Sequence, residues 1–232
     1  DRVAPKCPHF GICSGCVLQH LSNEKQIEAK QASLMENLQR IGHVKPEAIL
    51  PTLTADAWAY RRKGRFSVRY VEKKGGVLIG FREHDPRFVA QLHQCETIVP
   101  ELSALINSLQ IKQEITQIEF VAGDGPIALV LRHHVPFEAA DLARLAAFEQ
   151  GNNVQLYLQN GGAHTLLALS DNPQTLSFTL ASGIRFQFKP LDFIQVNAKL
   201  NEVMIEKTLQ LLEPSANDAV LDLFCGLGNF TL

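Results

Sequence analysis

The stretch "GRFSVRYVEKKGGVLIGFRE", residues 64–83, consists of two runs of strand-forming residues on either side of Gly75-Gly76. Paired glycines between such runs are typical of a tight β-hairpin turn. Comparable pairs of runs recur at residues 116–134, with a turn at 123–125, and at residues 176–188, with a turn at 182–183. The three hairpins predict a domain built on an antiparallel sheet.

Helical patterns surround these hairpins. Residues 22–43 carry Ile27, Leu34 and Ile41 at seven-residue intervals, with Leu38 on the same side. Ser22 or Asn23 can cap the start of this helix, and Gly42 suits a left-handed stop. Two more helices are expected at residues 139–151 and 197–214, and a strand is expected at residues 153–160. Helices mixed with hairpins predict an α+β fold.

The final stretch, "DAVLDLFCGLGNFTL" at residues 218–232, reads as a buried apolar strand that runs into a glycine-rich loop. A G-x-G turn after the first strand is typical of the ligand crevice of a doubly wound sheet. A dinucleotide site favours a third glycine, which is missing here, so S-adenosylmethionine is the better ligand prediction. The alternative is a strand followed by an ordinary turn. Cys225 lies within the loop and is interpreted as a small packed residue.

The bulk composition fits a globular protein. The chain has 232 residues, 46% of them hydrophobic, and a net charge of −2. Its apolar runs are too short to cross a bilayer. Five cysteines, without a recognisable secretory leader, favour a reducing, cytoplasmic location over a disulfide scaffold. Because residue 1 is Asp, the natural N-terminus is expected to lie upstream.

Four of the five cysteines suggest a metal site. Cys7, Cys13 and Cys16 fall within ten residues, and Cys95 lies far downstream. Zinc and iron–sulfur clusters both accept four thiolates, so the ligand set does not choose between them. The three-plus-one arrangement favours a cluster, although unrelated buried cysteines or a mixed site with His9, His20 or His93 remain alternatives. The spacing differs from the C-x3-C-x2-C loop of radical enzymes.

Residues 60–74, "YRRKGRFSVRYVEKK", form the most basic segment, with seven cations and one acid. Cations neutralise phosphates, and aromatic faces can stack on unpaired bases. Phe66 and Tyr70 share the strand parity of Val68, so both are predicted to face the core. A solvated hairpin without a ligand is the alternative. The candidate RNA-binding residues are Arg61, Arg62, Lys63, Arg65 and Arg69.

Four segments together carry a family resemblance: "CPHFGICSGCVLQH" at 7–20, "QCETIVP" at 94–100, "FIQVN" at 193–197 and "DLFCGLGNFTL" at 222–232. In order and spacing, the chain resembles the bacterial 23S rRNA (uracil-5-)-methyltransferases of the RumA/RlmD type. The resemblance covers essentially the whole chain. It implies S-adenosylmethionine-dependent methylation of C5 of a uridine in 23S rRNA.

The resemblance also implies site residues. A [4Fe-4S] cluster would be held by Cys7, Cys13, Cys16 and Cys95. S-adenosyl-L-methionine would contact Gln195, Phe224 and Asn229, in a pocket shaped by Asp222, Gly226 and Gly228. In the family's reaction a cysteine thiolate adds to C6 of the uracil, and C5 takes the methyl group from the sulfonium. A base then removes the C5 proton, and elimination of the thiolate from C6 frees the enzyme.

The resemblance further predicts how the chain is divided. Residues 1–18 and 51–188 would form a central iron–sulfur and RNA-binding domain. Residues 19–50 and 189–232 would be the first helices and strand of a Rossmann-like methyltransferase domain. The N-terminal TRAM domain and most of the catalytic domain, with its nucleophile and base, are expected to lie outside the chain. The chain alone is therefore expected to be inactive, and its apolar helix faces could drive self-association. The alternatives are a non-catalytic iron–sulfur or zinc RNA-binding module and a paralogue that methylates tRNA.

Overall fold

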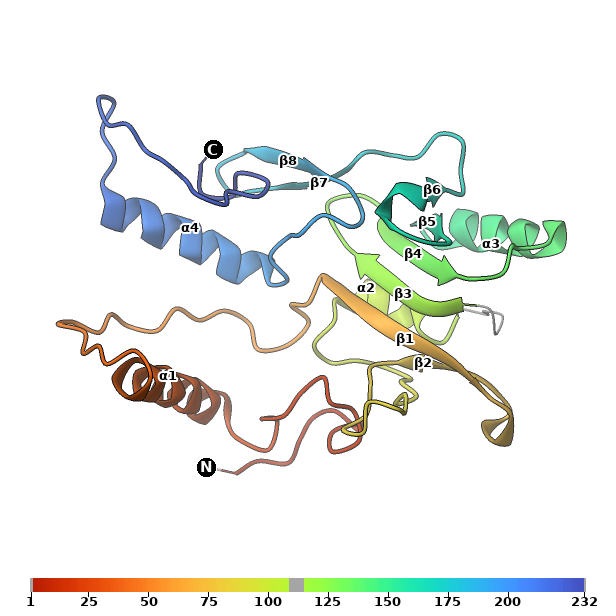
Figure 1. Ribbon diagram of the computed structural model, residues 1–232, viewed down its shortest axis with the longest axis horizontal. Helices are drawn as coiled ribbons and strands as arrows, with labels where there is room; N and C mark the ends of the chain where they lie inside the picture. Colours follow the sequence, from red (N-terminus) through yellow and green to blue (C-terminus); the bar gives the residue numbers. More distant parts are fainter. Residues whose placement is uncertain (1, 109–114, 232) are drawn as a thin grey trace.

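The computed structural model describes residues 2–108 and 115–231, and its centre is a six-stranded sheet (Figure 1). The strand order is β2-β1-β3-β4-β5-β6, and a separate two-stranded sheet contains β7 and β8. The three predicted hairpins are confirmed as β1–β2, β3–β4 and β7–β8. The strands are β1 Lys63–Val71, β2 Gly76–Gly80, β3 Ile115–Val121, β4 Ile127–His133, β5 Val154–Gln159, β6 Leu167–Ala168, β7 Leu176–Thr179 and β8 Arg185–Phe188.

The sheet is mixed rather than purely antiparallel, which corrects the sequence-based prediction. β4 and β5 pair in parallel, in a register that sets Ile127 opposite Val154. The other neighbouring strands pair antiparallel, as do β7 and β8. The helix α3, Ala139–Gly151, connects β4 to β5. A helical crossover returns the chain to the end of the sheet where the previous strand began, so the next strand runs in the same direction. The helix and the strand were predicted, but their mutual arrangement was not.

Two predicted helices begin at side-chain caps. The Ser22 hydroxyl accepts a hydrogen bond from the Lys25 N–H at 3.4 Å, and the Asn197 side chain accepts one from the Leu200 N–H at 3.0 Å. The left-handed residue after the first helix is His43, with φ of 52°, so the prediction for Gly42 was wrong.

Besides α3, the helices are α1 Asn23–Arg40, the unpredicted α2 Pro100–Leu105, and α4 Ala198–Leu212. The segments η1 Glu72–Lys74 and η2 Ala163–Thr165 are single turns. Within the described ranges, none of these helices could cross a membrane.

The six-stranded sheet buries both of its faces. Because side chains alternate along a strand, neighbouring residues contribute to different cores. On one face, Phe66 and Leu129 pack with Leu102 of α2 and Leu145 of α3. The other face packs against the β7–β8 hairpin and α4, through a cluster that includes Val121, Val130, Phe178, Phe186 and Ile205. The sheet therefore lies between α2 and α3 on one side and the β7–β8 hairpin and α4 on the other.

Phe66 is buried as predicted, but Tyr70 is 49% exposed, so its assignment to the core was wrong. The register of the sheet explains the difference. β1 pairs with β3 only from Lys63 to Ser67, whereas its pairing with β2 continues to Val71. Tyr70 therefore lies on the part of the hairpin that extends beyond β3, where less of the core is available to cover it.

The predicted buried strand near residues 218–224 is also wrong. This segment has no regular secondary structure, and Leu221, Leu223 and Phe224 are exposed. An apolar strand becomes buried only when neighbouring strands pair with it. No strand in the described residues does so. The helix α1 likewise buries none of its residues, and Leu34 and Ile41 of the predicted apolar stripe are exposed.

Candidate functional site

The four clustered cysteines line one cavity of about 250 Å³. The loop that holds the first three is tied to the segment that follows β2, because the backbone N–H and hydroxyl of Ser14 both donate to the Arg82 carbonyl, at 3.0 and 2.8 Å. The N–H of Cys95 donates to the Ser103 hydroxyl of α2 at 2.9 Å. Two distant parts of the sequence thus meet at this cavity, bringing together Cys7, Cys13, Cys16 and Cys95.

Burial and the neighbouring thiols both affect the cysteines. Burial is the main reason why the pKa of Cys7 and that of Cys13 are raised, and the charges of nearby cysteines add to the effect. His9 also lines the cavity, and burial followed by the charge of His93 lowers its pKa. Thiolates placed this close together repel one another, so a positively charged centre among them would favour their ionised form.

The cysteine cavity lacks the geometry of a mononuclear metal site. Across residues 2–108 and 115–231, no group of three or more His, Cys, Asp or Glu side chains is arranged to hold a metal ion. A single zinc ion with Zn–S bonds of about 2.3 Å would require the thiolates to converge on one point. The four cysteines predicted as ligands share one cavity.

The glycine loop near the end of the chain is a series of tight turns. Gly226 and Gly228 have φ of 60° and 87°, a left-handed conformation that glycine adopts without steric cost. The Gly228 N–H donates to the Cys225 carbonyl at 2.9 Å, and the Thr231 hydroxyl donates to the Asp222 carboxylate at 2.7 Å. These two bonds close the predicted G-x-G segment on itself.

An amide pair attaches the glycine loop to α4. The side chains of Asn201 and Asn229 donate to each other, at 2.9 and 2.8 Å. Asn201 is only 2% exposed, and it lies one helical turn before the buried Ile205. Because each amide has two N–H groups and two acceptor sites, Asn229 keeps one donor and spare acceptor capacity for a ligand. Asn201 was not predicted from the sequence, although an asparagine within an otherwise apolar helix face can indicate a buried polar contact.

Removing either member of this pair is expected to destabilise the chain. We expect Asn201→Ala to lower the free energy of unfolding by about 1–3 kcal/mol, because the Asn229 amide then loses its partner in a partly buried site. Urea denaturation of both single variants and the double variant measures the coupling between them. If the two single effects simply add, the amide pair does not hold the loop.

Gln195 is held through its backbone. Its carbonyl accepts a hydrogen bond from Arg62 Nε at 2.9 Å, and the Arg62 N–H donates to the next carbonyl, that of Val196, at 3.0 Å. Arg62 itself is buried, so it is not the surface cation that the basic segment predicted. Lys63 is half-buried and donates to the Pro190 carbonyl at 2.8 Å. Burial is the main cause that lowers the pKa of both cations.

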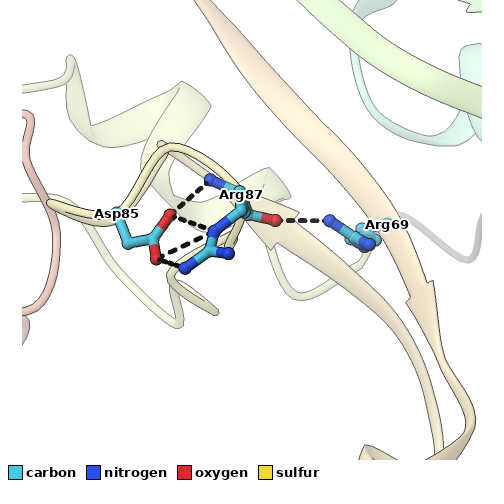
Figure 2. A network of polar contacts seen from close by, with 3 residues as sticks. All are labelled: Arg69, Asp85 and Arg87. Atoms are coloured by element: carbon cyan, nitrogen blue, oxygen red, sulfur yellow. Dashed lines mark hydrogen bonds and ion pairs between the residues drawn. The ribbon is translucent and has the colours of Figure 1, made fainter.

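The remaining candidate RNA-binding cations lie closer to solvent. Arg61 lines the cysteine cavity. Arg65 forms an ion pair with Glu119 of β3 at 2.7 Å. Arg69 donates to the Arg87 carbonyl, while the Arg87 guanidinium is held by the Asp85 carboxylate, with one contact at 2.6 Å (Figure 2). Since exposed ion pairs contribute little stability, the pair with Glu119 holds the Arg65 guanidinium only weakly.

Comparisons with known proteins agree with the resemblance stated from the sequence. A family profile described as tRNA (uracil-5-)-methyltransferase matches residues 22–232. The chain is 58% identical over its full length to the 23S rRNA (uracil(1939)-C(5))-methyltransferase RlmD of Stenotrophomonas maltophilia (strain K279a), and it covers 54% of that protein. The corresponding RlmD of Xanthomonas oryzae pv. oryzae (strain MAFF 311018) is 54% identical, again with the whole chain and 54% of the relative covered. The chain thus spans about half the length of the curated relatives it matches.

The fold has a solved counterpart. The crystal structure of Pyrococcus abyssi tRNA (uracil-54, C5)-methyltransferase in complex with S-adenosyl-L-homocysteine superimposes with a TM-score of 0.62, covering 95% of this chain and 56% of that one. The sequences are only 16% identical, so this likeness concerns the fold alone. The profile match and the two full-length sequence matches decide the family: the chain belongs to the tRNA (uracil-5-)-methyltransferase family.

Proposed function

We propose that this chain is part of an enzyme that transfers a methyl group from S-adenosylmethionine to C5 of a uridine in 23S rRNA. The observation that carries the proposal is the 58% identity, across the whole chain, with an RlmD protein. Because the chain covers only 54% of that relative, the proposal concerns the whole protein to which these residues belong. An rRNA substrate also suggests a cytoplasmic location.

The glycine loop and the segment around Gln195 are the proposed cofactor-binding elements. S-adenosylmethionine supplies an activated methyl group on its sulfonium when it is bound. Gln195, Phe224 and Asn229 would contact the cofactor, with Asp222 and the left-handed Gly226 shaping the turn beside it. Gly228 would let the backbone approach the cofactor closely. Two contacts support this assignment: Asn201 orients Asn229, and Arg62 fixes the backbone of Gln195.

The four cysteines that share a cavity are proposed to hold a [4Fe-4S] cluster. The support for this proposal is that all four thiols line one cavity of about 250 Å³, and a [4Fe-4S] cluster takes four cysteine thiolates. The cluster would join the N-terminal loop to the segment that precedes α2. Residues 1–18 and 51–188 would then act as a cluster-containing RNA-binding unit, and residues 19–50 and 189–232 would belong to the methyltransferase unit.

The exposed cations Arg65 and Arg69 are proposed to contact phosphates of the RNA. Both lie on β1 with their side chains held by weak surface partners. The methylation itself needs a nucleophile and a proton acceptor, and we propose that these come from outside residues 1–232. Cys225 is exposed, and its Sγ atom lies 3.8 Å from the Gly226 carbonyl oxygen.

A methyl-transfer assay with the full-length gene product tests the proposal. We expect radiolabelled methyl from S-adenosylmethionine to enter unmodified 23S rRNA at uridine C5. The variant Asn229→Ala should bind the cofactor several-fold more weakly, because one hydrogen-bonding side chain is lost. Asn217→Ala, which changes an exposed asparagine in the preceding loop, should bind normally.

Two alternatives make different predictions in the same assay. The matching family profile is described in terms of tRNA, so transfer to tRNA but not to 23S rRNA would favour a tRNA methyltransferase. A non-catalytic iron–sulfur or zinc RNA-binding module would bind RNA without transferring a methyl group to either substrate. Absence of transfer from a cofactor-bound, folded protein would contradict the proposed function.

A further inference from the structure

A second cavity, of about 610 Å³, lies where five segments of the chain meet. Its lining comes from the loop before β1, the N-terminal end of α2, the turn between β3 and β4, the connection from α3 to β5, and the N-terminal end of α4. Figure 1 labels these helices and strands. The second cavity shares no lining residue with the cysteine cavity, and none of the proposed cofactor contacts lines it. The functions assigned so far therefore do not account for it.

Arg62 forms part of the wall of this cavity and has unused hydrogen-bonding capacity. The residue is 8% exposed, and its guanidinium carbon lies 4.4 Å from the centre of the Phe178 ring. Nε donates to the Gln195 carbonyl, but Nη2 is buried without a partner among the described residues. Because Nη2 has almost no accessible surface, it does not face the cavity, and Arg62 contributes to the wall through its other atoms.

Two asparagines in the wall offer complementary groups. The Asn152 amide N–H donates to the Phe148 carbonyl at 2.8 Å, which leaves its oxygen as an acceptor. The Asn197 side-chain oxygen caps α4, which leaves its N–H₂ group as a donor. Tyr60, also in the wall, provides an aromatic face. The lining can thus donate, accept and stack.

The charge of the lining argues against a phosphate ligand. Two cations, Arg62 and Lys199, face three carboxylates, those of Asp56, Glu101 and Asp124. Lys199 is already paired with Asp56. A phosphate would meet an excess of negative charge, whereas a neutral group with both donors and acceptors would not. Nucleobases are such groups: proteins read them through amide and guanidinium contacts on their edges and aromatic contacts on their faces.

We propose that this cavity binds one unstacked nucleobase of single-stranded RNA, with Asn197 donating to a base carbonyl and Tyr60 stacking on the ring. The inference rests on the proposed function, because it assumes an RNA substrate. The volume lies within the range of about 300–1,000 Å³ that is usual for pockets holding small organic groups. The bound base would be separate from the uridine that is methylated and would help to select the RNA sequence around it.

Two matched pairs of variants test the inference. Tyr60→Ala removes the stacking face, and Tyr70→Ala removes an exposed tyrosine from the far part of the β1–β2 hairpin. Gly125→Leu adds bulk to a residue that lines the cavity, where a Cβ atom meets nothing within 4 Å, and Gly151→Leu makes the same change at a glycine outside the lining whose Cβ position is equally open. Circular dichroism and thermal unfolding establish that each variant is folded.

The measurement is fluorescence anisotropy with single-stranded segments of 23S rRNA. We expect Tyr60→Ala and Gly125→Leu to weaken RNA binding roughly tenfold, the size expected for the loss of one stacked base, while both controls bind like the unchanged chain. Photocrosslinking with RNA that contains 4-thiouridine should give a peptide that includes Tyr60. Binding by the two cavity variants equal to that of their controls would overturn the inference.

Two further outcomes separate this inference from its premises. If free nucleoside monophosphates occupy the cavity and RNA does not compete with them, the pocket serves a small molecule and the inference is wrong. If the unchanged chain binds no RNA, the RNA-binding part of the proposed function fails first. Normal RNA binding by both cavity variants contradicts only the nucleobase pocket.

Discussion

Cys95→Ser is expected to abolish binding of the proposed iron–sulfur cluster. Anaerobic reconstitution of the unchanged chain should yield about four iron and four sulfide ions per chain, with broad absorption in the visible range. Cys95 is the cavity-lining cysteine that comes from outside the N-terminal loop, so its loss disconnects the cluster from the segment before α2. A serine hydroxyl is a poor substitute because soft thiolates are the preferred ligands of these clusters.

Cys225→Ser provides the matched control for this experiment. Cys225 is exposed and does not line the cysteine cavity, so its replacement should leave the iron content and the visible spectrum unchanged. Equal loss of iron in both variants would indicate general damage rather than loss of a ligand. A full complement of iron in Cys95→Ser would rule out Cys95 as a ligand. One zinc and no iron in the reconstituted chain would replace the cluster proposal with a zinc site.

Gly80→Ala is expected to be the most destabilising single methyl addition in the sheet. A Cβ atom at Gly80 would lie 1.9 Å from the Ala90 carbonyl oxygen and 2.9 Å from Leu92 Cγ. The segment 90–92 is hydrogen-bonded alongside β2, with the Leu92 N–H donating to the Ile79 carbonyl at 3.0 Å, so it cannot move away freely. We expect the free energy of unfolding to fall by about 3 kcal/mol or more.

Gly125→Ala is the matched control for the glycine effect. A Cβ atom there meets nothing within 4 Å, and the residue does not have a left-handed φ. Its effect on the free energy of unfolding should stay within about 1 kcal/mol, and alanine offsets part of any loss because it restricts the unfolded chain. Urea denaturation of the two variants measures the difference. Equal stability would contradict the close contact between β2 and the segment 90–92.

The local parts of the fold could be predicted because their signals lie close together in the sequence. Gly75-Gly76 and the alternating residues around it predict the β1–β2 hairpin without reference to the rest of the chain. Ser22 predicts the start of α1 for the same reason. The parallel pairing of β4 with β5 gave no such signal, because it depends on where the α3 crossover returns the chain.

The candidate sites divide in a similar way. The spacing of Cys7, Cys13 and Cys16 indicated a ligand loop, and the cavity shared with Cys95 agrees with that grouping. The basic segment indicated a charged surface. Its composition could not predict that Arg62 is buried and donates to the Gln195 carbonyl while Arg65 is exposed. Nothing in the spacing of Asn201 and Asn229 indicated that their side chains form a pair.

The sequence by itself determined the hairpins, the main helices, the grouping of cysteines and the family resemblance, since each depends on residue type and spacing over short ranges or on whole motifs. Tertiary structure alone decided which faces are covered. It left Tyr70 and Leu221 exposed, buried Arg62, and joined Asn201 to Asn229. The physical reason is that burial and pairing depend on which distant segments pack together, and a periodic pattern specifies a face without specifying its partner.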